Sequence, residues 1–240
     1  MIEVKTAMVL AAGLGTRLRP ITEATPKALV TIKGRTLLDR ALDRLEAVGV
    51  ERAVVNLHYK AELVQRHLQR RERPRISFSP EPELLDTGGG IAQALPQLDE
   101  PFFVVNCDAV WTDEGRLPAL LRLARAFDPE RHDALLLLAK SVTAVGYEGS
   151  GDFLLDPMGV PRRRPEREQA PFLYAGVQLL SHRLFAGEIE ARFSINRLWD
   201  RAIEQNRIVA VVHEGAWFDP GTTAGLALTE SRLIERRYGP

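Results

Sequence analysis

The sequence has little of several features that mark particular classes of protein. It contains one cysteine, Cys107, so it can form neither an internal disulfide nor a zinc site built from several thiolates. Lysine plus arginine number 32 and so do aspartate plus glutamate, which leaves no net positive charge to neutralise a nucleic-acid backbone. The N-terminal stretch reaches Gly13 before an apolar segment long enough for a signal peptide or a spanning helix is complete. We therefore expect a cytoplasmic protein that binds neither nucleic acid nor membranes.

What the sequence does contain is an alternation of strand-like and helix-like segments. The short apolar run at 6–12 is typical of a strand buried on both faces of a parallel sheet. From Thr36, apolar residues recur every three or four positions as far as Val48, Thr36 with Asp39 resembles a capping box, and Gly49 can end the helix. Similar patterns predict strands at 52–57, 75–79, 101–106, 134–140, 174–180 and 207–213, and helices at 61–69, 91–98, 195–204 and 222–236. The order predicts an α/β fold in which an open, mostly parallel sheet has helices on both faces.

Residues 141–172 interrupt this alternation. They are rich in glycine, proline and arginine and have no helical period, which predicts hairpins and loops over the edge of the sheet, forming a small β-rich lobe. We interpret the basic run from Arg162 to Arg164 as a solvated hairpin end. Since we find neither a linker nor a repeat, we expect residues 1–240 to form a single domain.

The loop after the first strand has the strongest signal for chemistry. Gly13 and Gly15 follow the apolar run, and without a Cβ they let backbone N–H groups converge on an anion. Arg17 and Lys27 add charges that suit phosphate oxygens. The dinucleotide-binding fingerprint is incomplete, because a third glycine is missing where a helix should begin, and no Walker loop is present. The loop therefore predicts a site for a nucleoside triphosphate.

The same loop resembles a known signature. LAAGLGTRLRPITEATPK matches every fixed position of the pattern L-x-x-G-x-G-[TS]-R-[LM]-x-P-x-T-x-x-x-P-K of the sugar-1-phosphate nucleotidyltransferases, and SPEPELLDTGGGIAQAL, VVNCDAVW and WFDPGT are similar to three further motifs of that family. The resemblance implies a Rossmann-like nucleotidyltransferase fold with a small β-rich sugar-binding lobe and without a C-terminal β-helix domain. It implies catalytic roles for Arg17 and Lys27, and nucleotide contacts from Ala12, Gly13, Gly15 and Thr16.

Two aspartates that follow predicted strands are candidates for a metal site. Asp108 comes just after the strand predicted at 101–106, and Asp219 stands in WFDPGT. A carboxylate at a strand end costs stability unless a cation or a donor satisfies it, and two carboxylates completed by nucleotide phosphates are a common way to hold Mg²⁺. We therefore expect Asp108 and Asp219 to bind Mg²⁺. Cys107 stands where relatives usually have glycine, and we expect it to be a buried apolar residue rather than a catalytic thiol.

The segment from Ser79 to Gly90 resembles the base-recognition segment of the family. Glu81 could accept a hydrogen bond from N3–H of uracil, and the amide of Gly88 or Gly89 could donate to a ring carbonyl. The alternative is that the three consecutive glycines only form the start of a helix. The resemblance places contacts to the sugar at Asn106, Gly151, Asp152 and Tyr174.

Within the family, the segments TGGGI, NCDAVWTD and GDF resemble the short N-acetylmuramate-1-phosphate uridylyltransferases of bacterial cell-wall recycling, and short mannose-1-phosphate guanylyltransferases are similar too. The chain departs from the uridylyltransferases at Ala175, where they often have serine. The implied reaction is attack by an anionic oxygen of a sugar 1-phosphate on the α-phosphate of UTP or another nucleoside triphosphate, with release of pyrophosphate. A non-catalytic nucleotide-sugar-binding module and a dinucleotide-binding oxidoreductase are the alternatives from other classes.

Overall fold

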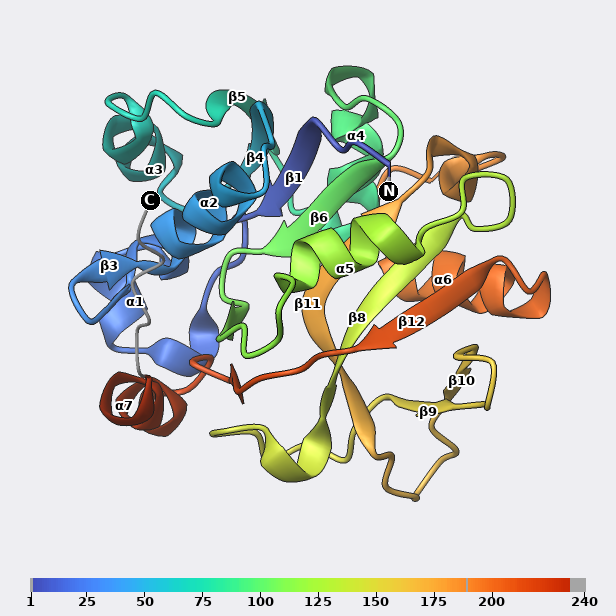
Figure 1. The fold of residues 1–240 in the computed structure, drawn as a ribbon. Helices are drawn as coiled ribbons and strands as arrows, with labels where there is room; N and C mark the ends of the chain where they lie inside the picture. Colours follow the sequence, from blue (N-terminus) through green and yellow to red (C-terminus); the bar gives the residue numbers. More distant parts are fainter. Residues whose placement is uncertain (1, 189, 234–240) are drawn as a thin grey trace.

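A computed structural model describes residues 2–188 and 190–233. Within these residues the main sheet has nine strands, seven of which lie side by side at its centre (Figure 1). Those seven are, in spatial order, β5 (Arg75–Pro80), β4 (Arg52–Leu57), β1 (Thr6–Leu10), β6 (Phe102–Asn106), β11 (Phe172–Leu180), β8 (Ala134–Lys140) and β12 (Ile208–Val212), and the hairpin β9 (Phe153–Leu155) and β10 (Pro161–Arg163) continues from β11.

The strand directions confirm the predicted parallel core. Strands β5, β4, β1 and β6 are parallel, β11 is antiparallel to β6 and β8, and β12 is again parallel to β8. The chain first moves outward from β1 to β4 and β5, and then returns to β6 on the other side of β1. Ligands of open α/β sheets bind at such a switch point, beyond the carboxyl ends of the strands. The loops after β1 and β6, which carry the predicted phosphate and metal residues, therefore meet there.

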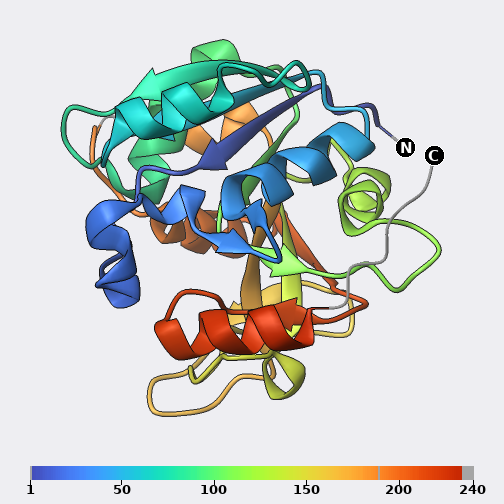
Figure 2. The same ribbon diagram turned by 90° about the vertical axis from the view of Figure 1, so that its left-hand side faces the viewer.

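Helices cover both faces of the sheet, as predicted, and enclose two hydrophobic cores (Figure 2). On one face α2 (Leu37–Ala47), α3 (Ala61–Leu68) and α5 (Ala119–Ala126) pack on the sheet, and on the other face α4 (Asp86–Ala94) and α6 (Ile195–Glu204) do so.

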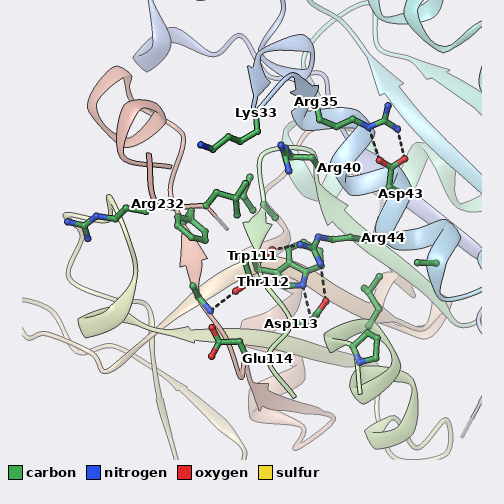
Figure 3. Close-up of a pocket in the computed structure, with 18 of the residues that line it drawn as sticks. Lys33, Arg35, Arg40, Asp43, Arg44, Trp111, Thr112, Asp113, Glu114 and Arg232 are labelled. Carbon is green, nitrogen blue, oxygen red and sulfur yellow. Dashed lines mark hydrogen bonds and ion pairs between the residues drawn. The ribbon is translucent and has the colours of Figure 1, made fainter. Parts of the chain in front are cut away.

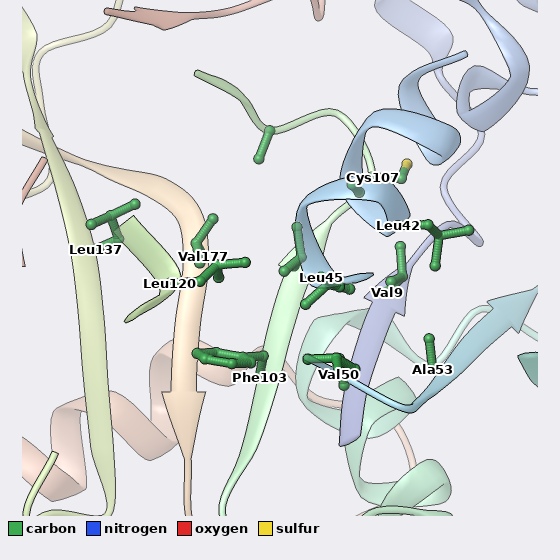
Figure 4. Packing of buried hydrophobic residues seen from close by; sticks show 14 of the residues in the cluster. Val9, Leu42, Leu45, Val50, Ala53, Phe103, Cys107, Leu120, Leu137 and Val177 are labelled. Carbon is green, nitrogen blue, oxygen red and sulfur yellow. The ribbon is translucent and has the colours of Figure 1, made fainter. Parts of the chain in front are cut away.

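Helix α2 illustrates how the sequence builds the first core. Thr36 caps it by accepting a hydrogen bond from the Asp39 amide, as the predicted capping box requires. Its buried leucines Leu42 and Leu45 lie against Val9 of β1 and Phe103 of β6 (Figure 4). Burying one such leucine contributes about 1.5 to 3 kcal/mol, so this face anchors the strand that leads into the phosphate loop.

Small elements at the carboxyl edge hold the remaining loops. The chain after β1 forms two short 3₁₀ turns and one helical turn, and a hairpin of two two-residue strands precedes α2. A further pair of two-residue strands joins the chain after β6 to the chain before the last helix. Together they enclose a third apolar cluster around Leu18 and Phe218. These elements are Thr16–Leu18, α1 (Ile21–Ala24), Lys27–Leu29, β2 (Thr31–Ile32) with β3 (Arg35–Thr36), β7 (Val110–Trp111) with β13 (Trp217–Phe218), and α7 (Thr223–Arg232); further 3₁₀ turns are Leu95–Gln97, Ser141–Thr143 and His182–Phe185.

Several predicted boundaries differ from the structure. The helix predicted at 91–98 begins at Asp86, because the glycines before it are helical, and α5 was not predicted at all. The helix predicted at 222–236 is observed as Thr223–Arg232, and its predicted residues 234–236 lie outside the described residues. Of the basic run interpreted as a solvated hairpin end, Arg162 is exposed as expected, whereas Arg163 and Arg164 are half-buried. Arg163 lies over the Phe153 ring at 4.9 Å and donates to Asp200, and Arg164 donates to the Gly151 carbonyl.

Candidate active site

Of the two glycines in the phosphate loop at 11–17, only Gly15 is required by the conformation of the loop. Gly15 has a φ of 64°, and a Cβ there would lie 2.9 Å from both Lys27 Cβ and Thr22 Cγ2. The Thr22 hydroxyl also donates to the Gly15 carbonyl at 2.8 Å. At Gly13, by contrast, no protein atom lies within 4 Å of the position a Cβ would take. Gly15 therefore shapes the loop, while Gly13 leaves open space above it.

This contrast gives a test within the loop. Gly15→Ala should lower the free energy of unfolding by about 2 to 4 kcal/mol, because alanine is strained in the left-handed backbone conformation and its Cβ would clash with Lys27 and Thr22. The melting temperature should then fall by roughly 5 to 15 °C. Gly13→Ala is the matched variant, and it should keep the wild-type melting temperature but raise KM for the triphosphate. Thermal unfolding and steady-state kinetics check both results, and equal melting temperatures for the two variants would contradict this account of Gly15.

Lys27 and Asp108 form an ion pair at the switch point. The Lys27 ammonium donates to the Asp108 carboxylate, and the two side chains are 17% and 25% exposed. Burial is the largest single influence and lowers the pKa of Lys27, but the negative charge of Asp108, the neighbouring Cys107 and the hydrogen bond to Asp108 together raise it by more, so the pKa lies above its ordinary value. The nearby Arg17 guanidinium acts in the opposite direction. Lys27 is therefore a fixed cation at neutral pH, with an anionic partner on one side and Arg17 close by.

Asp219 reaches the same place through the pairing of β13 with β7. Phe218 lies opposite Val110 in this antiparallel ladder, so continuing the register puts Asp219 opposite Ala109, next to Asp108. The Asp219 carboxylate accepts a hydrogen bond from the Gly221 amide at 2.9 Å. A Cβ on Gly221 would lie 2.9 Å from the Arg17 guanidinium, so Arg17 and Asp219 flank that glycine.

The donor set of Asp108 and Asp219 suits a hard cation. Both ligands are carboxylates, which Mg²⁺ prefers over nitrogen or sulfur. The described residues contain no cluster of three or more histidine, cysteine, aspartate or glutamate side chains that could enclose a metal. An ion held by two carboxylates would complete its shell with water and with substrate phosphate oxygens. Binding of Mg²⁺ by Asp108 and Asp219 stays a prediction.

Cys107 is not a nucleophile in this site. The side chain is buried, and burial together with the adjacent Asp108 charge raises the pKa of Cys107 to about 12. A thiol with that pKa stays protonated at neutral pH, and only the thiolate is reactive. The prediction of a buried apolar role is confirmed.

The base segment departs from the prediction in its glycine amides. The N–H groups of Gly88 and Gly89 both donate to the Phe193 carbonyl oxygen, at 2.9 and 3.1 Å. A Cβ at position 88 would collide with the Phe193 ring, and one at position 89 with the Ala191 carbonyl oxygen. The prediction that either amide donates to a base is thus corrected. These glycines allow α4 to approach residues 191–193, and the alternative of a glycine-rich helix start is the one observed.

Glu81 lies at the end of β5 but faces inward. It is 4% exposed, and its two carboxylate oxygens accept hydrogen bonds from Asn56 Nδ2 and from the Leu85 amide. Its contact with N3–H of a base stays a prediction. Asn56 was not singled out from the sequence, because an asparagine at the end of an apolar strand has no signal of its own.

The residues predicted to contact the sugar lie around β11. Asn106 ends β6, and the Asp152 carboxylate accepts from the Tyr174 amide at 2.8 Å. The Tyr174 ring packs against Trp199, and burial, followed by the Asp108 charge, raises the pKa of the Tyr174 hydroxyl, which stays protonated. Gly151, with a φ of 76°, donates its amide to the Tyr147 hydroxyl. These contacts order the edge of the lobe, and contact with a sugar stays a prediction.

Tyr147 is a further residue that the sequence did not reveal. Its ring lies edge-on to Trp217 at 6.2 Å, and burial together with charges that include Asp219 raises its pKa. The segment just before Tyr147 also contacts Asp219, since the Asp219 amide donates to the Val145 carbonyl at 2.8 Å. A lone tyrosine in a glycine-rich loop carries no sequence signal for this position.

A cavity of about 770 Å³ is separate from these residues (Figure 3). It lies between α2, β7 and the end of α7, and the Arg44 guanidinium stacks over the Trp111 ring in its wall at 4.3 Å. None of the predicted site residues lines it. Its wall includes Ala109 and Phe218, which adjoin Asp108 and Asp219 in sequence, but neither aspartate lines it.

Comparison with known proteins decides the family. The model of the MobA-like NTP transferase domain matches residues 7–180. The chain belongs to this family. The NTP transferase is 44% identical over 237 residues to the N-acetylmuramate alpha-1-phosphate uridylyltransferase of Caulobacter vibrioides, covering 96% of this chain and 98% of that protein. It is 35% identical over 226 residues to the enzyme of the same name from Neisseria meningitidis serogroup B, covering 92% and 94%.

Solved structures confirm the fold of this NTP transferase. A UDP-glucose pyrophosphorylase complexed with UDP-glucose superimposes with a TM-score of 0.77 at 18% identity, over 96% of this chain and 100% of that one. Among the described residues, no helix is both long enough and apolar enough to cross a membrane.

Proposed function

We propose that this NTP transferase moves the uridylyl group of UTP to N-acetylmuramate α-1-phosphate and releases pyrophosphate, as a step in the recycling of cell-wall sugars. The observation that carries the proposal is its similarity, over nearly the full length of both chains, to two uridylyltransferases with that substrate in their names. The position of Lys27, Asp108 and Asp219 at the switch point of the sheet supports it.

The reaction needs positioning and charge more than proton transfer. A sugar-phosphate oxygen is already an anion at neutral pH, so it attacks the α-phosphorus without a general base. The new P–O bond forms as the bond from the α-phosphorus to the oxygen bridging to the β-phosphate breaks, and pyrophosphate leaves with that electron pair. In this proposal Lys27 holds the sugar phosphate or the α-phosphate, and the exposed Arg17 holds the departing pyrophosphate.

We expect the metal ion next to Lys27 and Arg17. Asp108 and Asp219 would hold Mg²⁺ through carboxylate oxygens. When bound, the ion would offset negative charge on the triphosphate.

The remaining contacts follow the loops. The backbone of the phosphate loop at Ala12, Gly13, Gly15 and Thr16 would bind the triphosphate, because a glycine-rich loop at the end of a parallel strand presents its amides to an anion. The sugar would lie on the side of Asn106, Gly151, Asp152 and Tyr174, around the bulge of β11.

A pyrophosphate-release screen tests the function. The triphosphates of uridine, thymidine, cytidine and guanosine are each paired with the 1-phosphates of N-acetylmuramate, glucose and mannose, and with phosphocholine. We expect UTP with N-acetylmuramate α-1-phosphate to give the highest kcat/KM, about tenfold or more above any other pair, since unpaired buried polar groups penalise the wrong substrate. A higher kcat/KM for GTP with mannose 1-phosphate would replace the proposal by a guanylyltransferase, and binding of nucleotide sugars without turnover would replace it by a binding module.

A further inference from the structure

A buried polar pair lies between the two segments assigned to opposite ends of the nucleotide. Asn56 is at the carboxyl end of β4 and Glu81 follows β5, and each is 4% exposed. Strand β4 pairs with β1 on one side and with β5 on the other. A side chain at its carboxyl end can therefore reach the loops that follow both neighbours.

Three hydrogen bonds join these loops through the pair. The Ala11 amide donates to Asn56 Oδ1 at 2.6 Å, Asn56 Nδ2 donates to Glu81 Oε1 at 2.7 Å, and the Leu85 amide donates to Glu81 Oε2 at 3.1 Å. These partners fix which way the Asn56 amide points, because the Ala11 N–H needs an acceptor oxygen and the Glu81 carboxylate needs a donor N–H. Ala11 starts the phosphate loop and Leu85 directly precedes α4, so the bridge spans from one loop to the other.

The same contacts leave Glu81 little freedom to act alone. Each carboxylate oxygen has a protein donor, and a Cβ on Gly90 would lie 2.6 Å from Oε1, so α4 closes over the carboxylate. The backbone is held as well, because the Glu81 amide donates to the Leu57 carbonyl at 2.7 Å. Burying a carboxylate is costly unless it is hydrogen-bonded, and here its hydrogen bonds connect two functional loops.

We propose that Asn56 is a positioning residue for the nucleoside triphosphate, and that Glu81 acts through it by holding the phosphate loop and the base segment at a fixed separation. This inference rests on the proposed nucleotide substrate and is independent of the identity of the sugar. The competing account is that the Glu81 carboxylate itself reads the base.

A reciprocal exchange separates the two accounts. Asn56→Asp keeps the acceptor for Ala11 but turns a second carboxylate toward Glu81. Glu81→Gln leaves one oxygen for two donors, Asn56 and Leu85. In the double variant Asn56→Asp/Glu81→Gln, the new aspartate accepts from Ala11 and from the new glutamine amide, whose oxygen accepts from Leu85. The double variant thereby restores all three hydrogen bonds, with the one between positions 56 and 81 reversed in direction and with no carboxylate at position 81.

The measurements are the Kd for UTP with Mg²⁺ by calorimetry, the Kd for the sugar 1-phosphate, and the melting temperature of each variant. We expect each single variant to bind UTP about tenfold or more weakly, since a buried donor or charge is left unpaired, with the Kd for the sugar 1-phosphate unchanged. The double variant should recover UTP binding to within about threefold of the wild type. Gln178→Glu, which puts a carboxylate at another buried site, is the control and should lower the melting temperature without changing the Kd for UTP.

Three outcomes would overturn the inference. If the double variant binds UTP as weakly as Glu81→Gln, the carboxylate reads the base directly. If all variants bind UTP like the wild type and only the melting temperature falls, the bridge supports the fold alone. If the wild type binds none of the four triphosphates, the proposed function fails along with this inference, whereas wild-type binding with unaffected variants defeats only the inference.

Discussion

Asp108→Asn should lower turnover by about 10²-fold or more while leaving the fold intact, and Asp219→Asn should do the same. A factor of 10² is about 2.7 kcal/mol of transition-state stabilisation, which is within the several kcal/mol that metal charge compensation supplies. Asparagine keeps the size of Asp108 and an oxygen that can accept from Lys27, so the variant removes the charge more than the shape. The measurement is kcat at saturating UTP and sugar 1-phosphate, repeated over a series of Mg²⁺ concentrations.

A matched control for these variants is Asp99→Asn. Asp99 pairs with Arg52 at 2.7 Å through side chains that are 57% and 44% exposed, far from the switch point, and surface pairs of this kind contribute about 0 to 1 kcal/mol. It should keep wild-type kcat. Near-wild-type kcat in Asp108→Asn and Asp219→Asn at saturating Mg²⁺ would remove both carboxylates from the metal site.

Lys27→Ala should raise the Kd for the sugar 1-phosphate by about 10- to 10²-fold, and should raise the Kd for UTP by less. Hydrogen bonds to charged groups contribute about 1.5 to 3 kcal/mol, and the ammonium is a compact charge on a long stem that suits one phosphate. The variant also leaves the Asp108 carboxylate without its cation, which adds repulsion toward any phosphate nearby. Since the pKa of Lys27 is raised above its ordinary value of about 10.5, its charge is present at neutral pH, and the difference from wild type should be the same at about pH 7 and about pH 8.

Calorimetric titration with each ligand separately measures the two constants. Lys5→Ala is the control, because Lys5 pairs with Glu51 at 3.5 Å on an exposed surface and should leave both constants unchanged. Equal losses of affinity for UTP and for the sugar 1-phosphate in Lys27→Ala would contradict the assignment of Lys27 to the sugar side.

Local patterns predicted the elements well where burial follows a simple period. The strands at 52–57 and 134–140 and the helix at 195–204 have the predicted bounds, because strands buried on both faces are continuous apolar runs and an amphipathic helix repeats every three or four residues. Helix α5 had the same period, with buried residues at Leu120 and Leu123, but was not recognised after a glycine- and proline-containing loop. Two-residue strands such as β7 and β13 have no local pattern, since they exist only as partners of each other.

The sequence by itself determined which residue types stand at the carboxyl ends of the strands: a glycine-rich loop, the cations Arg17 and Lys27, and the aspartates Asp108 and Asp219. Only the tertiary structure decided which groups satisfy one another, because hydrogen-bond partners distant in the chain are chosen by packing. In the structure the amides of Gly88 and Gly89 donate to the Phe193 carbonyl, and the Glu81 carboxylate accepts from Asn56 and Leu85. A buried donor or acceptor must be paired, and several candidates exist for each in the sequence. The pairing is therefore set by which groups the sheet brings within about 3 Å of each other.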